Sequence, residues 1–90
     1  SGLPLLYTQP LPFAVECLCF VGADRLMLGG VDGRVREWSV PRGCQVGQLL
    51  VSHQPVWSLC RLPGGRLAVG CEDGAVRLLA KAPRQGALWE

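Results

Sequence analysis

The sequence predicts an all-β protein built from two copies of one four-stranded antiparallel unit. Residues 14–40 and 55–81 align without a gap at a constant offset of 41 positions. Ten of the 27 aligned positions are identical, including the Asp-Gly pairs at 32–33 and 73–74. Short apolar runs alternate with turn residues, and no helical period competes with them. These observations together favour short strands joined by tight turns.

Four strands are predicted in the first copy, at residues 14–21, 25–30, 34–40 and 44–51. Gly22-Ala23-Asp24 separates the first two strands, because these residue types tolerate the backbone angles of turns. Asp32-Gly33 lies between apolar runs, which is the strongest short-range signal of a hairpin.

The second copy repeats this order after Pro55. Pro63-Gly64-Gly65 and Asp73-Gly74 mark its turns, and strands are predicted at residues 66–71 and 75–81. Moving the fourth strand of the first copy back by 41 positions places it near the amino end. We therefore expect residues 3–8 to be the outer strand of a preceding unit, and residues 87–90 to begin another outer strand.

The chain accordingly divides into three parts. Residues 1–13 hold an outer strand and a connection, residues 14–54 form the first repeat, and residues 55–90 form the second. Strand-containing repeats with a period near 40 point to a propeller-type array. Each sheet of such an array is covered on both faces by its neighbours, so two units leave apolar faces bare. Since soluble monomers rarely expose large apolar patches, we expect coverage by further blades of the same chain, by self-association or by a partner subunit.

The turn residues of both copies resemble the WD40-repeat family. Residues 28–39 place Asp32-Gly33 before a strand that ends on Trp38-Ser39, where that family has Trp-Asp. The second copy keeps Asp73-Gly74, but Leu79-Ala80 replaces the Trp-Asp pair. Ser52-His53 matches the Gly-His dipeptide of the family, which the first copy lacks.

This resemblance implies two four-stranded antiparallel blades of a WD40-like β-propeller, a partial propeller. It assigns structural roles in turns and strands to Asp32, Gly33, Trp38, Asp73 and Gly74. Many members of the family bury a hydrogen-bond network of His, Asp, Ser/Thr and Trp inside each blade. Leu28 and Val69 occupy the Ser/Thr place here, so we expect incomplete networks and reliance on apolar packing. A citron-homology-like propeller is the second family considered, and Trp38 and the constant spacing favour WD40.

The composition argues against several classes of protein. Nine basic and seven acidic residues give a net charge of +2, too small for a nucleic-acid surface that relies on bulk charge. The apolar runs are too short to cross a bilayer, so no membrane partner is expected. Five cysteines lie in apolar runs, which predicts buried free thiols and a cytoplasmic location, with the nucleus as the alternative. The one histidine leaves no ligand set for a metal.

No nucleophile, base and orienting group converge, and no Gly-rich loop suits a phosphate, so we expect no enzyme and no cofactor. The candidate binding residues are the repeated arginines and two residues near the second repeat's first strand: Arg34, Arg36, Arg77, Trp57 and His53. A planar guanidinium binds acidic groups or phosphate well, although solvated strand edges and turns are the commoner reason for arginines in such places. The predicted function is a non-catalytic scaffold for protein partners, and the alternative is an RNA-binding segment of a ribonucleoprotein component.

Overall fold

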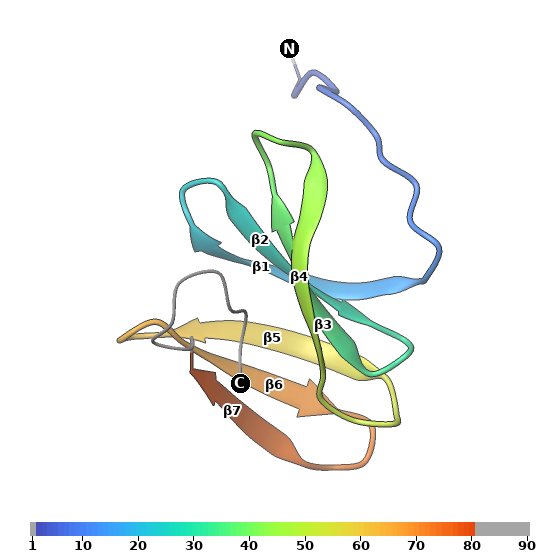
Figure 1. Ribbon diagram of the computed structural model, residues 1–90, viewed down its shortest axis with the longest axis vertical. Coiled ribbons are helices and arrows are strands. Elements are labelled where there is room, and N and C mark those ends of the chain that lie inside the picture. Colours follow the sequence, from blue (N-terminus) through green and yellow to red (C-terminus); the bar gives the residue numbers. More distant parts are fainter. Residues whose placement is uncertain (1, 81–90) are drawn as a thin grey trace.

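The computed structural model describes residues 2–80, which form seven strands and two antiparallel sheets (Figure 1). In chain order the strands are β1 (Val15–Gly22), β2 (Arg25–Gly30), β3 (Arg34–Ser39), β4 (Cys44–Leu50), β5 (Val56–Leu62), β6 (Arg66–Cys71) and β7 (Val76–Ala80). The first sheet has the order β1-β2-β3-β4 and the second has the order β5-β6-β7. The predicted all-β class is confirmed. The strand expected at 87–90 lies outside the described residues.

Each sheet is a meander because consecutive strands are joined by turns of two to four residues. Gly33 and Gly74 both have a positive φ, of 81° and 84°, in the turns that the Asp-Gly pairs predicted. Glycine adopts this conformation without the steric cost that a Cβ imposes. The register between β1 and β2 shifts between Val15 and Cys17, and that between β5 and β6 shifts at the equivalent place. The two repeats therefore share this irregularity in strand pairing as well as their turns.

Residues 3–8, expected to be the outer strand of a preceding blade, form no strand among the described residues, where β1 is the first strand. A strand exists only through hydrogen bonds to a neighbouring strand, and β1 pairs only with β2 within the first sheet. The segment is an extended trace outside the sheets (Figure 1), and its Tyr7 hydroxyl donates to the carbonyl of Val40 at 3.2 Å. Its pairing with a preceding blade, and the boundaries at 1–13, 14–54 and 55–90, stay predictions.

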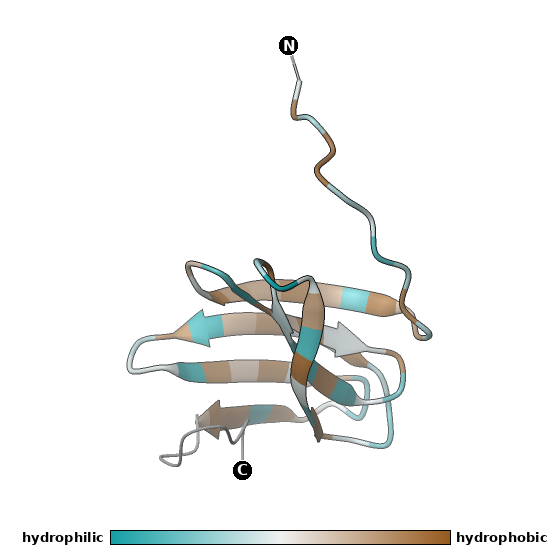
Figure 2. Cartoon of the chain, turned by 45° about the horizontal axis from the view of Figure 1, so that its top comes forward, coloured by the Kyte–Doolittle hydropathy of each residue, from teal (hydrophilic) through white to brown (hydrophobic). Residues whose placement is uncertain are grey.

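The core lies between the two sheets. Its buried members come from β2, β3, β5 and β6: Met27, Val35, Val56, Leu67, Val69 and Cys71. Apolar residues follow the strands, and many of the turns between them are hydrophilic (Figure 2). The face of the first sheet that carries Met27 and Val35 packs on the face of the second that carries Leu67 and Val69.

The two outward faces carry the repeat-equivalents of these core residues. Val35 is fully buried between the sheets, whereas Val76, its equivalent in the second repeat, is 75% exposed. Val56 is fully buried, whereas its equivalent Val15 is 41% exposed. At these two positions, the residue is core where a second sheet covers it and surface where none does.

All five cysteines are free. Cys71 is buried, as expected of thiols in apolar strands, and burial raises the pKa of the half-buried Cys17 thiol. Cys60 is exposed, so the expectation of burial is wrong there. It lies on the outward face of the second sheet, and no strand among residues 2–80 covers that face.

Candidate functional site

The turn between β2 and β3 is closed by one carboxylate. Asp32 Oδ1 accepts hydrogen bonds from the backbone N–H of Arg34 at 3.1 Å and from Arg36 Nη1 at 3.1 Å. Its Oδ2 accepts from Arg36 Nη2 at 2.7 Å. The backbone bond is the usual way in which an aspartate stabilises a turn. The two bonds from Arg36 form a bidentate pair, the geometry that suits guanidinium and carboxylate best.

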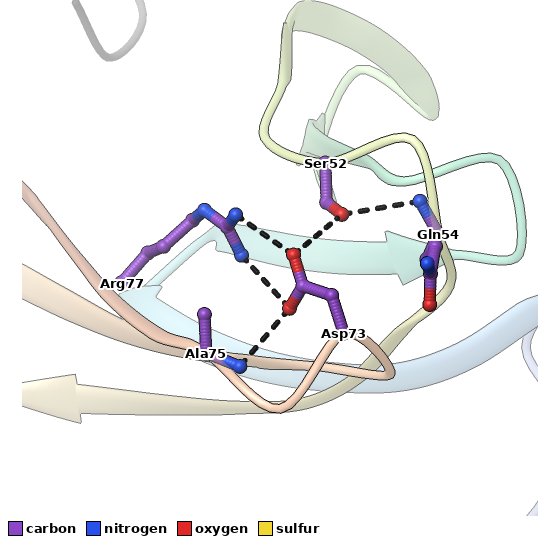
Figure 3. Close-up of polar contacts among 5 residues, drawn as sticks. All are labelled: Ser52, Gln54, Asp73, Ala75 and Arg77. Atoms are coloured by element: carbon purple, nitrogen blue, oxygen red, sulfur yellow. Dashed lines mark hydrogen bonds and ion pairs between the residues drawn. The ribbon is translucent and has the colours of Figure 1, made fainter.

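The turn between β6 and β7 repeats this arrangement (Figure 3). Asp73 Oδ1 accepts from the backbone N–H of Ala75 at 3.0 Å and from Arg77 Nη1 at 3.2 Å. Its Oδ2 accepts from Arg77 Nη2 at 2.8 Å. Each repeat thus contains the same turn, in which an aspartate is held by the arginine four residues later.

The second turn is also tied to the connection that leads from β4 to β5. The Ser52 hydroxyl donates to Asp73 Oδ2 at 3.3 Å and accepts from the backbone N–H of Gln54 at 3.1 Å (Figure 3). Since Ser52 is buried, this short chain of hydrogen bonds satisfies its hydroxyl and links the first repeat to the second.

The connection contacts the first turn through the backbone. The N–H groups of Val51 and Ser52 both donate to the carbonyl of Gly33, at 2.9 and 3.2 Å. A Cβ on Gly33 would collide with the Ser52 carbonyl, whereas a Cβ on Gly74 would meet nothing within 4 Å. Gly33 is therefore needed for a close approach as well as for its φ angle.

The arginines keep both carboxylates ionised. The bidentate bond from Arg36 lowers the pKa of Asp32 from 3.8 to about 2, and the backbone N–H of Arg34 acts in the same direction. The bond from Arg77 lowers the pKa of Asp73 from 3.8 to about 2, with help from Ala75 and Ser52. In return, the pKa of Arg77 is raised. A carboxylate held in this way is a weak base at neutral pH.

The predicted binding arginines therefore have structural partners. Arg36 and Arg77 are paired with Asp32 and Asp73, and Arg34 Nη1 lies 3.6 Å from Asp32 Oδ2. The sequence interpretation treated them as free side chains and missed these pairs. A spacing of four residues between aspartate and arginine, present in both repeats, was the available signal.

The other predicted residues lie apart from one another. Trp38 is buried and pairs across the sheet with Leu26. Trp57 is about half exposed at the start of β5, and His53 is exposed in the connection before it. Among the hydrogen bonds of residues 2–80, His53 takes no part in the Asp73 network, whose hydroxyl comes from Ser52 instead. Within residues 2–80, no set of hydrogen bonds joins His, Asp, Ser/Thr and Trp into the network of the family.

A cavity of about 370 Å³ opens beside the second turn. It is lined by Leu50 at the end of β4, by residues 51–54 of the connection, and by Asp73 and Arg77. This volume falls in the range of roughly 300–1,000 Å³ that is typical of ligand pockets. The cavity therefore brings together two predicted binding residues, His53 and Arg77, and leaves Arg34, Arg36 and Trp57 outside it.

No helix among residues 2–80 has the length and apolar character needed to cross a membrane. In the same range, no group of three or more His, Cys, Asp or Glu side chains is placed to hold a metal ion.

Comparison with known proteins identifies the repeat. The WD40 family model (WD domain, G-beta repeat) matches residues 44–78, from the start of β4 into β7. U3 small nucleolar RNA-associated protein 4 homolog from Mus musculus is 35% identical over 71 residues, which are 78% of this chain and 10% of that protein. The protein of the same name from Homo sapiens is 34% identical over 71 residues, with the same coverage. The chain thus spans about a tenth of the length of these relatives.

Solved structures with this arrangement of strands include a natural and a designed protein. The β-propeller domain of Cps50 (Swd1) from Myceliophteria thermophila superposes with a TM-score of 0.76 at 14% identity, over 87% of this chain and 27% of that one. The computationally designed Ika4 protein gives a TM-score of 0.69 at 20% identity, over 89% of this chain and 49% of that one. These likenesses concern the fold. The family match shows a WD40 repeat at residues 44–78, and the structural likenesses show that the two sheets have the fold of β-propeller blades.

Proposed function

We propose that this chain is a non-catalytic scaffold for protein partners and forms part of a larger WD40 β-propeller. The observation that carries the proposal is the contrast between the covered and the outward faces of the two sheets. Positions that are core between the blades, such as that of Val35, are surface on the outward face, as at Val76. A further sheet on each outward face would bury these residues as the present interface buries their equivalents.

The rims of the blades are the surfaces on which partners would bind. Loops held by rigid sheets commonly carry binding residues, and here the connection at 51–55 is fixed to both Asp-Gly turns by hydrogen bonds. The absence of catalysis is supported by chemistry: the two turn carboxylates have pKa values of about 2 and are engaged by arginine. Such groups are poorly matched to proton transfer near neutral pH.

A second candidate function is RNA binding by the same propeller, and one observation favours it. The relatives from mouse and human are named for association with U3 small nucleolar RNA. Those names also favour a nuclear over a cytoplasmic location for this chain. Against direct RNA contact, the repeated arginines Arg36 and Arg77 already neutralise aspartates, so they offer less charge to phosphates. We therefore place the chain in a ribonucleoprotein assembly as a protein-binding component.

Analytical ultracentrifugation of the 90-residue chain tests the exposed faces. We expect concentration-dependent self-association that persists at high salt, because it would bury apolar surface. The double variant Val76→Lys/Leu78→Lys places two charges on the outward face of the second sheet, where both side chains are exposed, and should weaken association. The control Ala23→Lys/Pro41→Lys changes two exposed turn residues of the first sheet, away from both outward faces, and should not. A wild-type chain that stays monomeric at all concentrations would contradict the proposal.

Binding of a short single-stranded RNA separates the two functions. Direct recognition predicts an affinity that falls steeply with salt, since counterions are released from the phosphates. A protein scaffold predicts no saturable RNA binding by this chain at physiological salt. Tight, salt-dependent binding would make RNA recognition the better hypothesis.

A further inference from the structure

The two Asp–Arg turns differ in what covers the arginine. In the first repeat, the ring of Phe13 lies over the guanidinium of Arg36, with 3.6 Å between Arg36 Cζ and the ring centroid. Gln54 stands 41 positions later, where the second repeat would need a ring. The side chain of Arg36 is 11% exposed and that of Arg77 is 36% exposed. The second turn is therefore an uncovered copy of the first.

The cavity lies at the uncovered copy. Both Gln54 and Arg77 line it, together with Leu50, which supplies an exposed apolar side chain. The guanidinium plane of Arg77 is fixed by its two bonds to Asp73 (Figure 3). A fixed guanidinium plane is a good surface for stacking an aromatic ring.

We propose that this cavity binds an aromatic side chain of a partner polypeptide, which stacks on Arg77 as Phe13 stacks on Arg36. This inference rests on the proposed scaffold function and specifies one of its contacts. The filled copy in the first repeat shows that a phenylalanine from a polypeptide segment fits such a turn. Because Asp73 balances the charge of Arg77, a neutral ring suits the cavity better than a phosphate does.

One substitution shifts the expected position of the ring. Gly30 lies under Phe13, and a Cβ at Gly30 would come within 3.2 Å of Phe13 Cδ2. The second repeat has Cys71 at this position. The partner ring is therefore expected closer to the connection, over Gln54 and Leu50, than an exact copy of Phe13 would be.

The probe is a capped synthetic peptide with the sequence of residues 9–16, which contains the natural ring. Nuclear magnetic resonance of the ¹⁵N-labelled 90-residue chain follows the side-chain Nε–H signals of Arg77 and Arg36. A saturable ring-current shift is expected at Arg77, whereas Arg36, already covered, serves as the internal reference. The same peptide with leucine in place of phenylalanine should give no such shift. Adenosine monophosphate tests the nucleobase alternative: a shift with the nucleotide and none with the peptide would overturn the proposal.

Two variants and one control separate stacking from folding. Gln54→Phe supplies a ring from within and leaves Asp73 and Arg77 intact, so it should weaken peptide binding by about tenfold or more. Arg77→Lys keeps the charge, removes the planar surface and should weaken binding to a similar extent, followed in this variant by the backbone N–H signal of Gln54. Gln48→Phe adds a ring at an exposed position of β4, outside the cavity, and should leave binding unchanged. Undiminished binding by Gln54→Phe, or no shift at Arg77 with millimolar peptide, would disprove the site. Either result would leave the scaffold function standing, because that function is tested by association of the outward faces.

Discussion

Asp32 and Asp73 each perform two tasks with one carboxylate. Each accepts a backbone N–H two residues later, which shapes the turn, and each anchors the guanidinium four residues later, which orients a long side chain along the sheet. Both tasks favour the ionised form, which explains why both pKa values fall to about 2. The turns therefore couple folding to pH.

Acid should destabilise the chain in a defined range. The carboxyl pKa values are lower in the folded than in the unfolded chain, so the pairs contribute fully above pH 3.8, and this contribution is lost as the pH falls toward about 2. Urea unfolding at a series of pH values should show the loss. Asp32→Asn and Arg36→Gln should each reduce the steepness of the loss, and Arg42→Gln, at an exposed residue outside both turns, should not. An equally steep loss in Asp32→Asn would refute this origin.

The two turn glycines offer a matched pair of substitutions. Gly74→Ala should cost about 1–2 kcal/mol in free energy of unfolding, because alanine is strained at its φ of 84°. Gly33→Ala meets a similar strain at a φ of 81° and also a collision with the Ser52 carbonyl. It should therefore cost at least twice as much in chemical denaturation. Equal costs would mean that the connection moves aside freely.

At the scale of elements, the connection between β4 and β5 joins the two blades. Its backbone donates to the carbonyl of Gly33 in the first blade, and its Ser52 hydroxyl donates to Asp73 in the second. It thereby bridges the turn of one hairpin and the turn of the next. The relative position of the sheets thus depends on a few polar contacts as well as on the apolar core.

Removing the hydroxyl of this connection tests its contribution. Ser52→Ala should lower the free energy of unfolding by about 1 kcal/mol, the usual value of a partly buried hydrogen bond. It should also speed amide hydrogen exchange at Gln54, which loses its acceptor. Ser58→Ala, at an exposed serine of β5, provides the control and should be nearly neutral. If both variants behave alike, the Ser52–Asp73 bond contributes nothing measurable.

At the scale of the whole molecule, the burial of a residue in one repeat can be compared with that of the equivalent residue in the other. Each blade carries apolar side chains on both faces, yet only the faces between β1–β4 and β5–β7 meet among the described residues. The outward positions include Leu18, Phe20, Val76 and Leu78, all more than half exposed. This exposure is the basis of the proposal that further sheets stack on the outward faces.

Substitutions at two equivalent valines measure how much coverage by a second sheet contributes to stability. Val35→Ala removes a fully buried side chain and should cost about 2–3 kcal/mol, through lost burial and the cavity left behind. Val76→Ala, at the equivalent position, should cost less than about 0.5 kcal/mol, because its side chain is 75% exposed. Thermal or urea unfolding compares the two. Within a complete propeller, Val76→Ala should become as costly as Val35→Ala, and a low cost there would argue against a covering blade.

The sequence by itself determined the all-β class, the repeat and both turns, because these depend on local preferences: an Asp-Gly pair shapes its own hairpin, and alternating residues define a strand. Even the arginine pairs depended on a spacing that both repeats display. The tertiary structure alone decided which apolar positions are core, since Val35 and Val76 have equivalent places and opposite exposure. It also decided that residues 3–8 form no strand and that Ser52, rather than His53, bonds to Asp73. Burial, strand pairing and long-range hydrogen bonds depend on which distant segment of the chain packs against a residue. The local sequence around that residue does not specify the segment.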